Sequence, residues 1–149
     1  MSKKRFEFRL ARVLKIRRLE ERVARSAWGE AESRTRTAEA HAQTMRSELE
    51  EARAELRKNL GGLLRPQNVE LAHRLIDRRV TELAQAQASV ETLRDQAARL
   101  AQAWRERDAR KQALERLEER HLGRHRLEAL VEEGREMDER AGWRDEEGV

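Results

Sequence analysis

Two histidines four residues apart are the side chains in this chain best spaced for metal chemistry. His121 and His125 would lie on one face of a helix, and two imidazoles at that spacing can hold a zinc ion. A third ligand would have to come from a distant glutamate, and the His-Glu-x-x-His pattern of zinc peptidases is absent. His41 and His73 stand alone. We therefore interpret all four histidines as surface residues and expect neither a metal site nor a cofactor.

Catalytic motifs are missing as well. The sequence contains no Gly-x-x-x-x-Gly-Lys-Ser/Thr loop, no Gly-x-Gly-x-x-Gly turn and no Gly-x-Ser-x-Gly elbow. It contains no cysteine, which excludes a disulfide framework and thiol chemistry. Trp28, Met45 and Trp104 fit the packing seam described below better than a cofactor box. The sequence therefore predicts a protein that is not an enzyme.

The N-terminal region is rich in cations that could contact phosphates or anionic lipid. Glu7, Glu20 and Glu21 interrupt this cluster, and the Asn-x-x-Ala-Ala pattern of basic leucine zippers is absent. The same stretch holds more apolar residues than one intramolecular seam needs. We therefore expect a protein partner with an acidic or apolar groove and no nucleic acid; a coil that binds nucleic acid or anionic membrane is the alternative. The cations are Lys3, Lys4, Arg5, Arg9, Arg12, Lys15, Arg17, Arg18, Arg22 and Arg25, and the apolar residues are Phe6, Phe8, Leu10, Val13, Ile16 and Leu19.

The elements that position these side chains are predicted to be helices. The 149 residues are 42% charged and 3% aromatic, a poor composition for a compact globule. Disordered chains are poor in apolar residues and rich in Pro, Gly and Ser. Here there is one proline, and most residues are Ala, Leu, Glu, Arg or Gln, which favour helix. The composition therefore indicates a long helical coil with a solvated surface of mixed charges.

Apolar residues recur at steps of three and four in two long runs, which is the period of a coiled-coil seam. Arg17, Glu21, Thr35 and Asn59 interrupt the first run, and Arg79 interrupts the second. The first run is Leu14, Arg17, Glu21, Ala24, Trp28, Ala31, Thr35, Ala38, Ala42, Met45, Leu49, Ala52, Leu56, Asn59 and Leu63. The second run is Val69, Ala72, Ile76, Arg79, Leu83, Ala86, Val90, Leu93, Ala97, Leu100 and Trp104.

One breaker, residues 60–66, separates the two runs. Gly61-Gly62 predicts a left-handed cap at the end of the first helix, and Pro66 suits the first turn of the next. We therefore predict an all-α fold, in which two long helices form an antiparallel coiled-coil hairpin and the second helix is longer. This single domain, residues 1–149, would have helices at 8–59 and 67–139, a turn at 60–66 and a frayed tail at 140–149. A parallel dimer of long helices is the alternative.

The hairpin predicts which residues face each other. With the turn centred near residue 63, Trp28 would lie near Leu100, and Glu21 would lie opposite Lys111 and Arg107, so that it could pair with either cation. Beyond about residue 121 the second helix would have no intramolecular partner. No apolar run approaches the ~20 residues that span a bilayer, and the N-terminus does not read as a signal peptide. The unpartnered apolar residues would be Leu122, Leu127, Leu130, Val131 and Met137.

With its ends laid out in this way, the chain resembles the FliJ family, the small coiled-coil component of the bacterial flagellar type III export apparatus. The length, the scarcity of proline and the position of the breaker agree with that family. The first matching stretch is Phe6-x-Phe8-x-Leu10-x-x-Val13-Leu14-x-x-Arg17, followed by Glu20-Glu21. The second comprises Trp104-Arg105-Glu106, Lys111-x-x-Leu114-Glu115-x-Leu117, Glu132-Glu133 and Met137-Asp138-Glu139. Injectisome stalk proteins of the YscO type are similar.

This resemblance implies a cytoplasmic stalk, peripheral on the cytoplasmic side of the cell membrane, that promotes export of flagellar subunits. The implied partners are the export ATPase FliI, whose ring would receive the end bearing both termini, the export gate protein FlhA, and export chaperones. An older description of the family connects it with chemotaxis. The ATPase-facing residues would be Phe8, Leu10, Val13, Leu14, Arg17, Leu114 and Leu117. The gate-facing residues would be Leu75, Ile76, Arg79, Val80 and Leu83, where the family carries an aromatic residue that this chain lacks.

Overall fold

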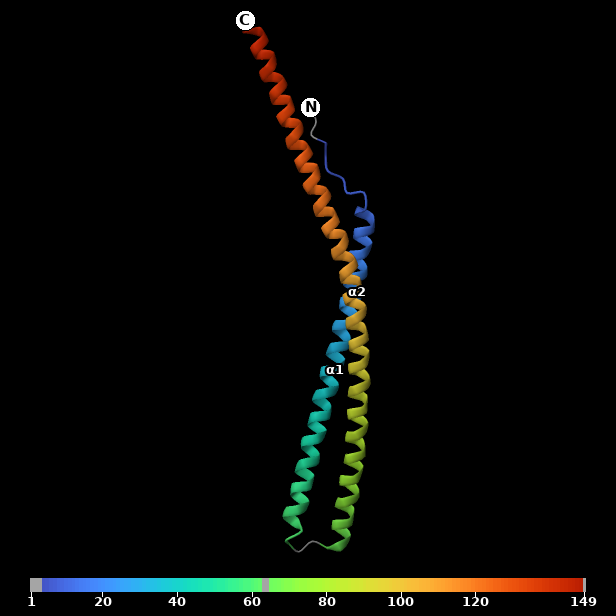
Figure 1. The fold of residues 1–149 in the computed structure, drawn as a ribbon. Coiled ribbons are helices and arrows are strands. Elements are labelled where there is room, and N and C mark those ends of the chain that lie inside the picture. The colour runs from blue at the N-terminus through green and yellow to red at the C-terminus, as the bar shows by residue number, and fades with distance from the viewer. Residues whose placement is uncertain (1–3, 63–64, 149) are drawn as a thin grey trace. The chain divides into compact units, whose positions relative to one another are not determined.

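The computed structural model describes residues 4–62 and 65–148, and its regular secondary structure in these ranges is entirely helical. Helix α1 spans Ala11–Asn59 and helix α2 spans Pro66–Glu147, with 49 and 82 residues. The two helices run antiparallel, and the chain reverses between them (Figure 1). The predicted all-α hairpin with a longer second helix is therefore confirmed.

The start of α1 differs from the predicted position at residue 8. Phe8 is buried and lies outside the helix, and its carbonyl oxygen accepts a hydrogen bond from the Ala11 N–H at 3.1 Å. Residues 4–8 have no regular secondary structure and residues 9–10 form a turn, so the helix begins only at Ala11, after Phe8 has packed as an anchor. Residues 4–10 therefore form a separate segment, which we call the strap.

The second helix is longer than predicted at both ends. It begins at Pro66, whose fixed φ suits the first helical position, and the Arg65 carbonyl accepts a hydrogen bond from the Asn68 N–H at 3.0 Å. It ends at Glu147 instead of residue 139. The segment predicted to be a frayed tail contains no proline. Gly142 lies between residues that favour helix, and this one glycine does not end α2.

The end of α1 lacks the predicted left-handed glycine cap. None of the described glycines has a positive φ. Instead, the Gly62 N–H donates to the Asn59 carbonyl at 3.1 Å, a bond three residues long that tightens the last turn and satisfies one terminal carbonyl. Leu63 and Leu64, which also belong to the predicted breaker, lie outside the described residues.

The helices contribute to two compact units, each containing a stretch of α1 and a stretch of α2. Unit 1 comprises residues 1–22 and 105–149, and unit 2 comprises residues 23–104. The described residues nearest both chain ends belong to unit 1, whereas the end of α1 and the start of α2 belong to unit 2.

The core of unit 2 is a narrow seam of mostly small side chains. Thr35 is buried in this seam, and its hydroxyl donates to the Ala31 carbonyl one turn earlier at 2.9 Å, so the buried oxygen does not lack a partner. All but one of the buried residues belong to the predicted heptad runs, and the exception is Ala101. They are Ala31, Thr35, Ala42 and Leu49 in α1 and Val90, Ala97 and Ala101 in α2.

The two tryptophans of the seam meet each other. The Trp28 and Trp104 rings are stacked, with centroids 5.1 Å apart and planes at 23°. Trp28 therefore faces a residue one helical turn beyond the predicted Leu100. The buried positions of α2 step from Ala97 to Ala101 and not to Leu100, since a helix with 3.6 residues per turn drifts against a strict 3.5-residue repeat.

Candidate partner-binding surfaces

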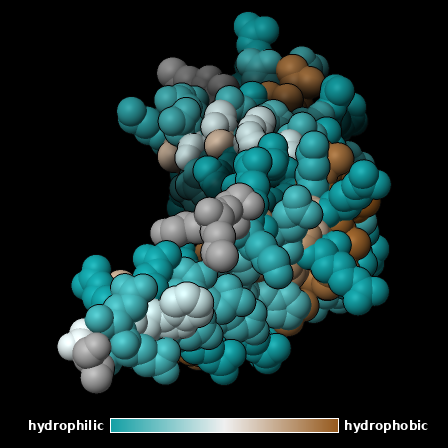
Figure 2. Space-filling model, turned by 90° about the horizontal axis from the view of Figure 1, so that it is seen from above, coloured by the Kyte–Doolittle hydropathy of each residue, from teal (hydrophilic) through white to brown (hydrophobic). Residues whose placement is uncertain are grey.

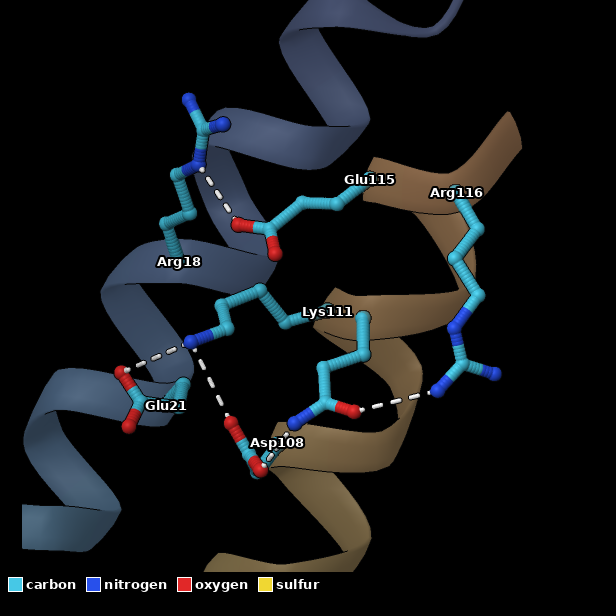
Figure 3. A network of polar contacts seen from close by, with 7 residues as sticks. Arg18, Glu21, Asp108, Lys111, Glu115 and Arg116 are labelled. Carbon is cyan, nitrogen blue, oxygen red and sulfur yellow. Dashed lines mark hydrogen bonds and ion pairs between the residues drawn. The ribbon is translucent and has the colours of Figure 1, made fainter. Parts of the chain in front are cut away.

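A layer of charged residues crosses the interior of unit 1. Glu21 is only 2% exposed, and its carboxylate lies 3.9 Å from the Lys111 ammonium, which is also 3.2 Å from Asp108 (Figure 3). Arg18 of α1 donates to Glu115 of α2 at 3.3 Å. Glu21 thus selects Lys111 from its two predicted partners. A buried carboxylate facing a cation favours this pairing of the two helices, because a shifted register would separate the carboxylate from the cation that α2 supplies.

The other predicted cation, Arg107, lies 3.9 Å from Glu20, the neighbour of Glu21. Arg17 also pairs with Glu20, at 3.0 Å along its own helix. Glu20 therefore neutralises one cation from each helix. Glu20 and Glu21 of α1 therefore lie against Arg107 and Lys111 of α2 as matched charges.

The strap packs on α2 through two ring pairs. The Phe8 and His121 rings meet edge to face, with centroids 5.6 Å apart, and the Phe6 and His125 rings are tilted, with centroids 5.5 Å apart. Two extended residues advance roughly 6.6 Å and four helical residues about 6 Å, so alternate strap residues meet successive turns of the helix. The two histidines that sequence spacing offered to zinc therefore pack against phenylalanines. No group of three potential metal ligands occurs among the described residues.

The seven residues expected to face the ATPase all belong to unit 1, but most of them serve the hairpin itself. Phe8 and Leu14 are buried, and only Val13 is exposed to a substantial degree. The partly buried members are Leu10, Arg17, Leu114 and Leu117. The interior of a hairpin has the same apolar composition as a docking face, which is why sequence alone did not separate the two.

A different set of residues on α1 is open to a partner. Ile16 and Leu19 are 56% and 60% exposed, and with Val13 they lie at three-residue spacing along one side of the helix. Three cations on the same turns make no ion pair with any described residue. We call this the α1 surface: Val13, Ile16 and Leu19 with Arg12, Lys15 and Arg22. The signal in the sequence was the surplus of apolar residues over one seam.

The five residues expected to face the export gate lie on α2 in unit 2. Leu75 and Val80 are exposed, as is the neighbouring Leu71. Ile76, Arg79 and Leu83 are partly buried, and they belong to the predicted seam. The Arg79 guanidinium donates to the Glu48 carbonyl of α1 at 3.4 Å. The exposed part of this expected surface is therefore Leu75 and Val80.

An open groove of about 890 Å³ lies between α1 and α2 in unit 2, lined by both helices. Arg94 crosses it, bonding to Glu39 of α1 at 2.9 Å and to Glu91 of its own helix at 2.9 Å. The hydrogen bond that the Arg94 guanidinium donates to Glu39, more than its contact with Glu91, raises the pKa of Arg94. An ion pair that bridges the two helices therefore lines the groove. The described lining residues include no combination of acid, base and nucleophile that would support catalysis.

The face of the molecule seen in Figure 2 is mostly hydrophilic, with separate hydrophobic patches. The large apolar residues exposed in unit 1 include, besides the α1 surface, Leu127, Leu130, Val131 and Met137 of α2, as predicted. Leu122, predicted to be unpartnered with them, is partly buried. Within the described residues, neither helix is apolar enough over a sufficient length to cross a bilayer.

Comparison with known proteins identifies the family. Residues 6–144 match the family model described as "Flagellar FliJ protein". No curated protein and no solved structure matches the chain. The family match covers nearly all of the 149 residues, and both stretches that carried the resemblance lie within it. The chain therefore belongs to the FliJ family of non-enzymatic components of the flagellar protein export apparatus.

Proposed function

We propose that this chain is a central stalk of the flagellar export apparatus, and that it binds the export ATPase FliI through the α1 surface. The observation that carries the proposal is the exposure of Val13, Ile16 and Leu19 beside three cations that pair with no described residue. Exposing apolar side chains to water costs free energy. A partner that covers them removes this cost, which is why exposed apolar patches mark interaction sites.

The chemistry of the α1 surface defines its partner. Full burial of a Val, Leu or Ile side chain is worth about 1.5–3 kcal/mol, so three of them can supply the centre of an interface. Arg12, Lys15 and Arg22 form a cationic border, which favours carboxylates on the other side and a fast encounter with them. The ATPase should therefore offer an apolar patch with acidic residues around it.

The buried members of the expected ATPase site have a supporting role in this proposal. Phe8 and Leu14 pack inside unit 1, and the Glu21–Lys111 pair lies one to two turns further along α1. These contacts hold the first turns of α1 as a helix on α2, so that Ile16 and Leu19 point outward. Their substitution would disturb binding indirectly, through loss of the hairpin.

The second proposed contact is with the export gate protein FlhA, through Leu75 and Val80 of unit 2. Its support is the exposure of both side chains together with family membership. No aromatic residue stands at this place, so the contact would rest on aliphatic side chains. Binding of both partners would make the chain a link between ATPase and gate, and would promote export.

The direct test uses the purified full-length chain and the FliI protein of the same organism. We expect the chain to co-elute with FliI, to raise its rate of ATP hydrolysis and to increase the fraction assembled as rings. Absence of both binding and stimulation would contradict the proposal. For the gate, Leu75→Glu with Val80→Glu should abolish capture by the cytoplasmic part of FlhA and leave ATPase stimulation intact.

A further inference from the structure

The part of α2 that follows the strap is a helix that the hairpin does not cover. Every described residue from 126 to 148 is exposed, and the chain is nevertheless helical as far as Glu147. A helix of this length is only marginally stable in water unless one of its sides packs against a partner. We call residues 124–147 the distal helix. Beyond His125, the hairpin buries none of its residues.

An apolar seam runs along the distal helix. Its members follow one another at steps of three and four, which is the spacing of a coiled coil. The three large members are 63% to 69% exposed. A Cβ placed on Gly134 would meet no atom within 4 Å, so the hairpin itself does not require a glycine there. We call these positions the distal seam: Leu127, Leu130, Gly134, Met137 and Ala141.

The distal seam lies on the side of α2 that is turned away from the strap. His121 and His125 mark the side that the strap covers. At about 100° per residue, Leu127 points roughly 160° away from His125. A second helix can therefore lie along the distal seam without displacing the strap.

We propose that the distal seam packs against the same seam of a second copy of this chain, with the two distal helices antiparallel. A two-fold axis relates the copies, so each contact forms twice. At one register, every large seam residue of one copy meets a small residue or an aliphatic stem of the other. Gly134 then leaves room for a methionine side chain of the second copy. The facing pairs are Gly134 with Met137, Leu130 with Ala141, and Leu127 with Arg144.

The charges on both edges of the distal seam are complementary at the same register. In coiled coils, the residues that flank the seam face flanking residues of the other helix and form ion pairs with them. Val131 faces Asp138, which stays at the solvated rim, and no like charges meet. Glu133 already takes part in another interaction within the chain, whereas the other paired residues form no ion pair with a described residue. The flanking pairs are Arg124 with Asp145, Arg126 with Glu147, and Glu133 with Arg140.

A parallel dimer of the same helices would bring like charges together. Glu133 would face Asp138 of the second copy, and Arg144 would meet Arg144 inside the seam. Gly134 would also meet Gly134, which leaves that layer of the seam without a side chain. Like charges that face each other are a common means by which coiled coils exclude a pairing. The sequence therefore favours the antiparallel arrangement.

Shifted antiparallel registers are also less favourable. A slide of one heptad toward the start of the distal helix would place Arg126 opposite Arg140, and Glu133 opposite Glu133 of the second copy. A slide of two heptads would place Gly123 opposite Gly134, and neither glycine has a side chain to fill the layer. The proposed register avoids both defects.

The overlap is long enough for a coiled-coil dimer, although its apolar area is small. Residues 124–147 span somewhat more than three heptads, the length over which sustained apolar positions indicate such a coil. Glycine and alanine occupy two of the five seam positions, which limits the apolar area that each copy covers. We therefore expect a dissociation constant on the order of 10 µM. The contact is independent of the α1 surface and of the proposed stalk function.

The first test is sedimentation equilibrium of the full-length chain at about 1 to 300 µM, a range that brackets the expected constant. Leu130→Ser with Met137→Ser should raise the dissociation constant at least tenfold. The matched control is Trp143→Ala, because Trp143 is exposed on the other side of the same helix, roughly 160° from Leu127. The control should dimerise as the unmodified chain does, and circular dichroism should show that all variants remain helical.

A charge reversal tests the register. Arg126→Glu should weaken the dimer at least threefold, since the new carboxylate would face Glu147 of the second copy at two places. Arg126→Glu with Glu147→Arg should restore the dissociation constant to within about twofold of the unmodified chain, because the pair is then rebuilt with its charges exchanged. Failure of the second substitution to restore dimerisation would contradict the register.

Disulfide formation tests the direction of the helices, because the chain contains no cysteine of its own. Leu130→Cys with Ala141→Cys should give covalent dimers on oxidation, since the two positions face each other across the copies. Either substitution alone should give none, whereas a parallel dimer would cross-link through both single variants. The proposal is overturned if the unmodified chain stays monomeric at every concentration, if Trp143→Ala weakens the dimer as much as the seam variant does, or if the single cysteine variants cross-link as fully as the double one.

Discussion

Trp28 of α1 and Trp104 of α2 stack on each other, with ring centroids 5.1 Å apart, in a seam that is otherwise built from small side chains. The Trp28 indole N–H also donates to Glu32 at 3.3 Å, which anchors one ring to its own helix. In a core made mainly of alanine, this pair supplies much of the apolar area that joins the helices of unit 2.

Replacing Trp104 with alanine should therefore lower the free energy of unfolding by about 2 kcal/mol, from lost burial and lost ring stacking. Urea unfolding followed by circular dichroism measures it as a lower midpoint. Trp143→Ala is the matched control, because Trp143 is 74% exposed and its loss should change stability by less than about 0.5 kcal/mol. Equal effects of the two substitutions would refute the role given to the stack.

Lys111→Met should destabilise the chain by about 2–3 kcal/mol, because the buried Glu21 carboxylate would lose the cation that α2 supplies to it. The double variant Glu21→Leu with Lys111→Met should recover most of this loss, since apolar side chains of similar size can replace a buried ion pair. A double-mutant cycle from urea unfolding gives the coupling energy. A coupling near zero would mean that the pair does not act as a unit.

Phe8→Ala should release the strap. Loss of the Phe8–His121 contact removes the best-buried anchor of residues 4–10, and trypsin should then cut after Arg9 at least tenfold faster. Phe6→Ala is the milder comparison, because Phe6 is only partly buried. If neither substitution accelerates cleavage, the ring pairs do not hold the strap on α2.

Gly29→Ala should stabilise the chain by about 0.5–1 kcal/mol. Gly29 lies in the interior of α1, and a Cβ placed there would meet no atom within 4 Å. Alanine would thus restrict the unfolded chain without strain in the folded one. Thermal unfolding should report a higher midpoint; a lower one would indicate a contact at this position that the hairpin alone does not explain.

The heptad spacing was sufficient to predict the hairpin, the longer second helix and the meeting of Glu21 with Lys111, because buried apolar spacing and charge matching act over many turns. The heptad spacing was insufficient where a single side-chain contact or the local backbone conformation determines the structure. Trp28 meets Trp104 and not Leu100, because the two helices pair one helical turn away from the predicted register. After α1, the Gly62 N–H donates to the Asn59 carbonyl, and no glycine there adopts a positive φ. Glycine can adopt either backbone conformation, so the sequence did not distinguish this ending from a left-handed cap.

The same limit applies to the candidate surfaces. Leu14 and Ile16 are both aliphatic residues in one helix, yet Leu14 is 2% exposed and Ile16 is 56% exposed. By composition, both residues belong to the same apolar end of the hairpin. Only the position of α2 shows that Leu14 packs inside the hairpin and that Ile16 is exposed to a partner.

The proposed stalk function depends most directly on the rate of ATP hydrolysis by FliI with increasing amounts of the variant Ile16→Glu with Leu19→Glu. Both side chains are exposed, so the hairpin should stay intact while the α1 surface acquires charges that repel an acidic partner. We predict that the unmodified chain and the control Leu71→Glu with Leu75→Glu stimulate FliI equally, and that the α1 variant needs at least a tenfold higher concentration. Full stimulation by the α1 variant would contradict the assignment.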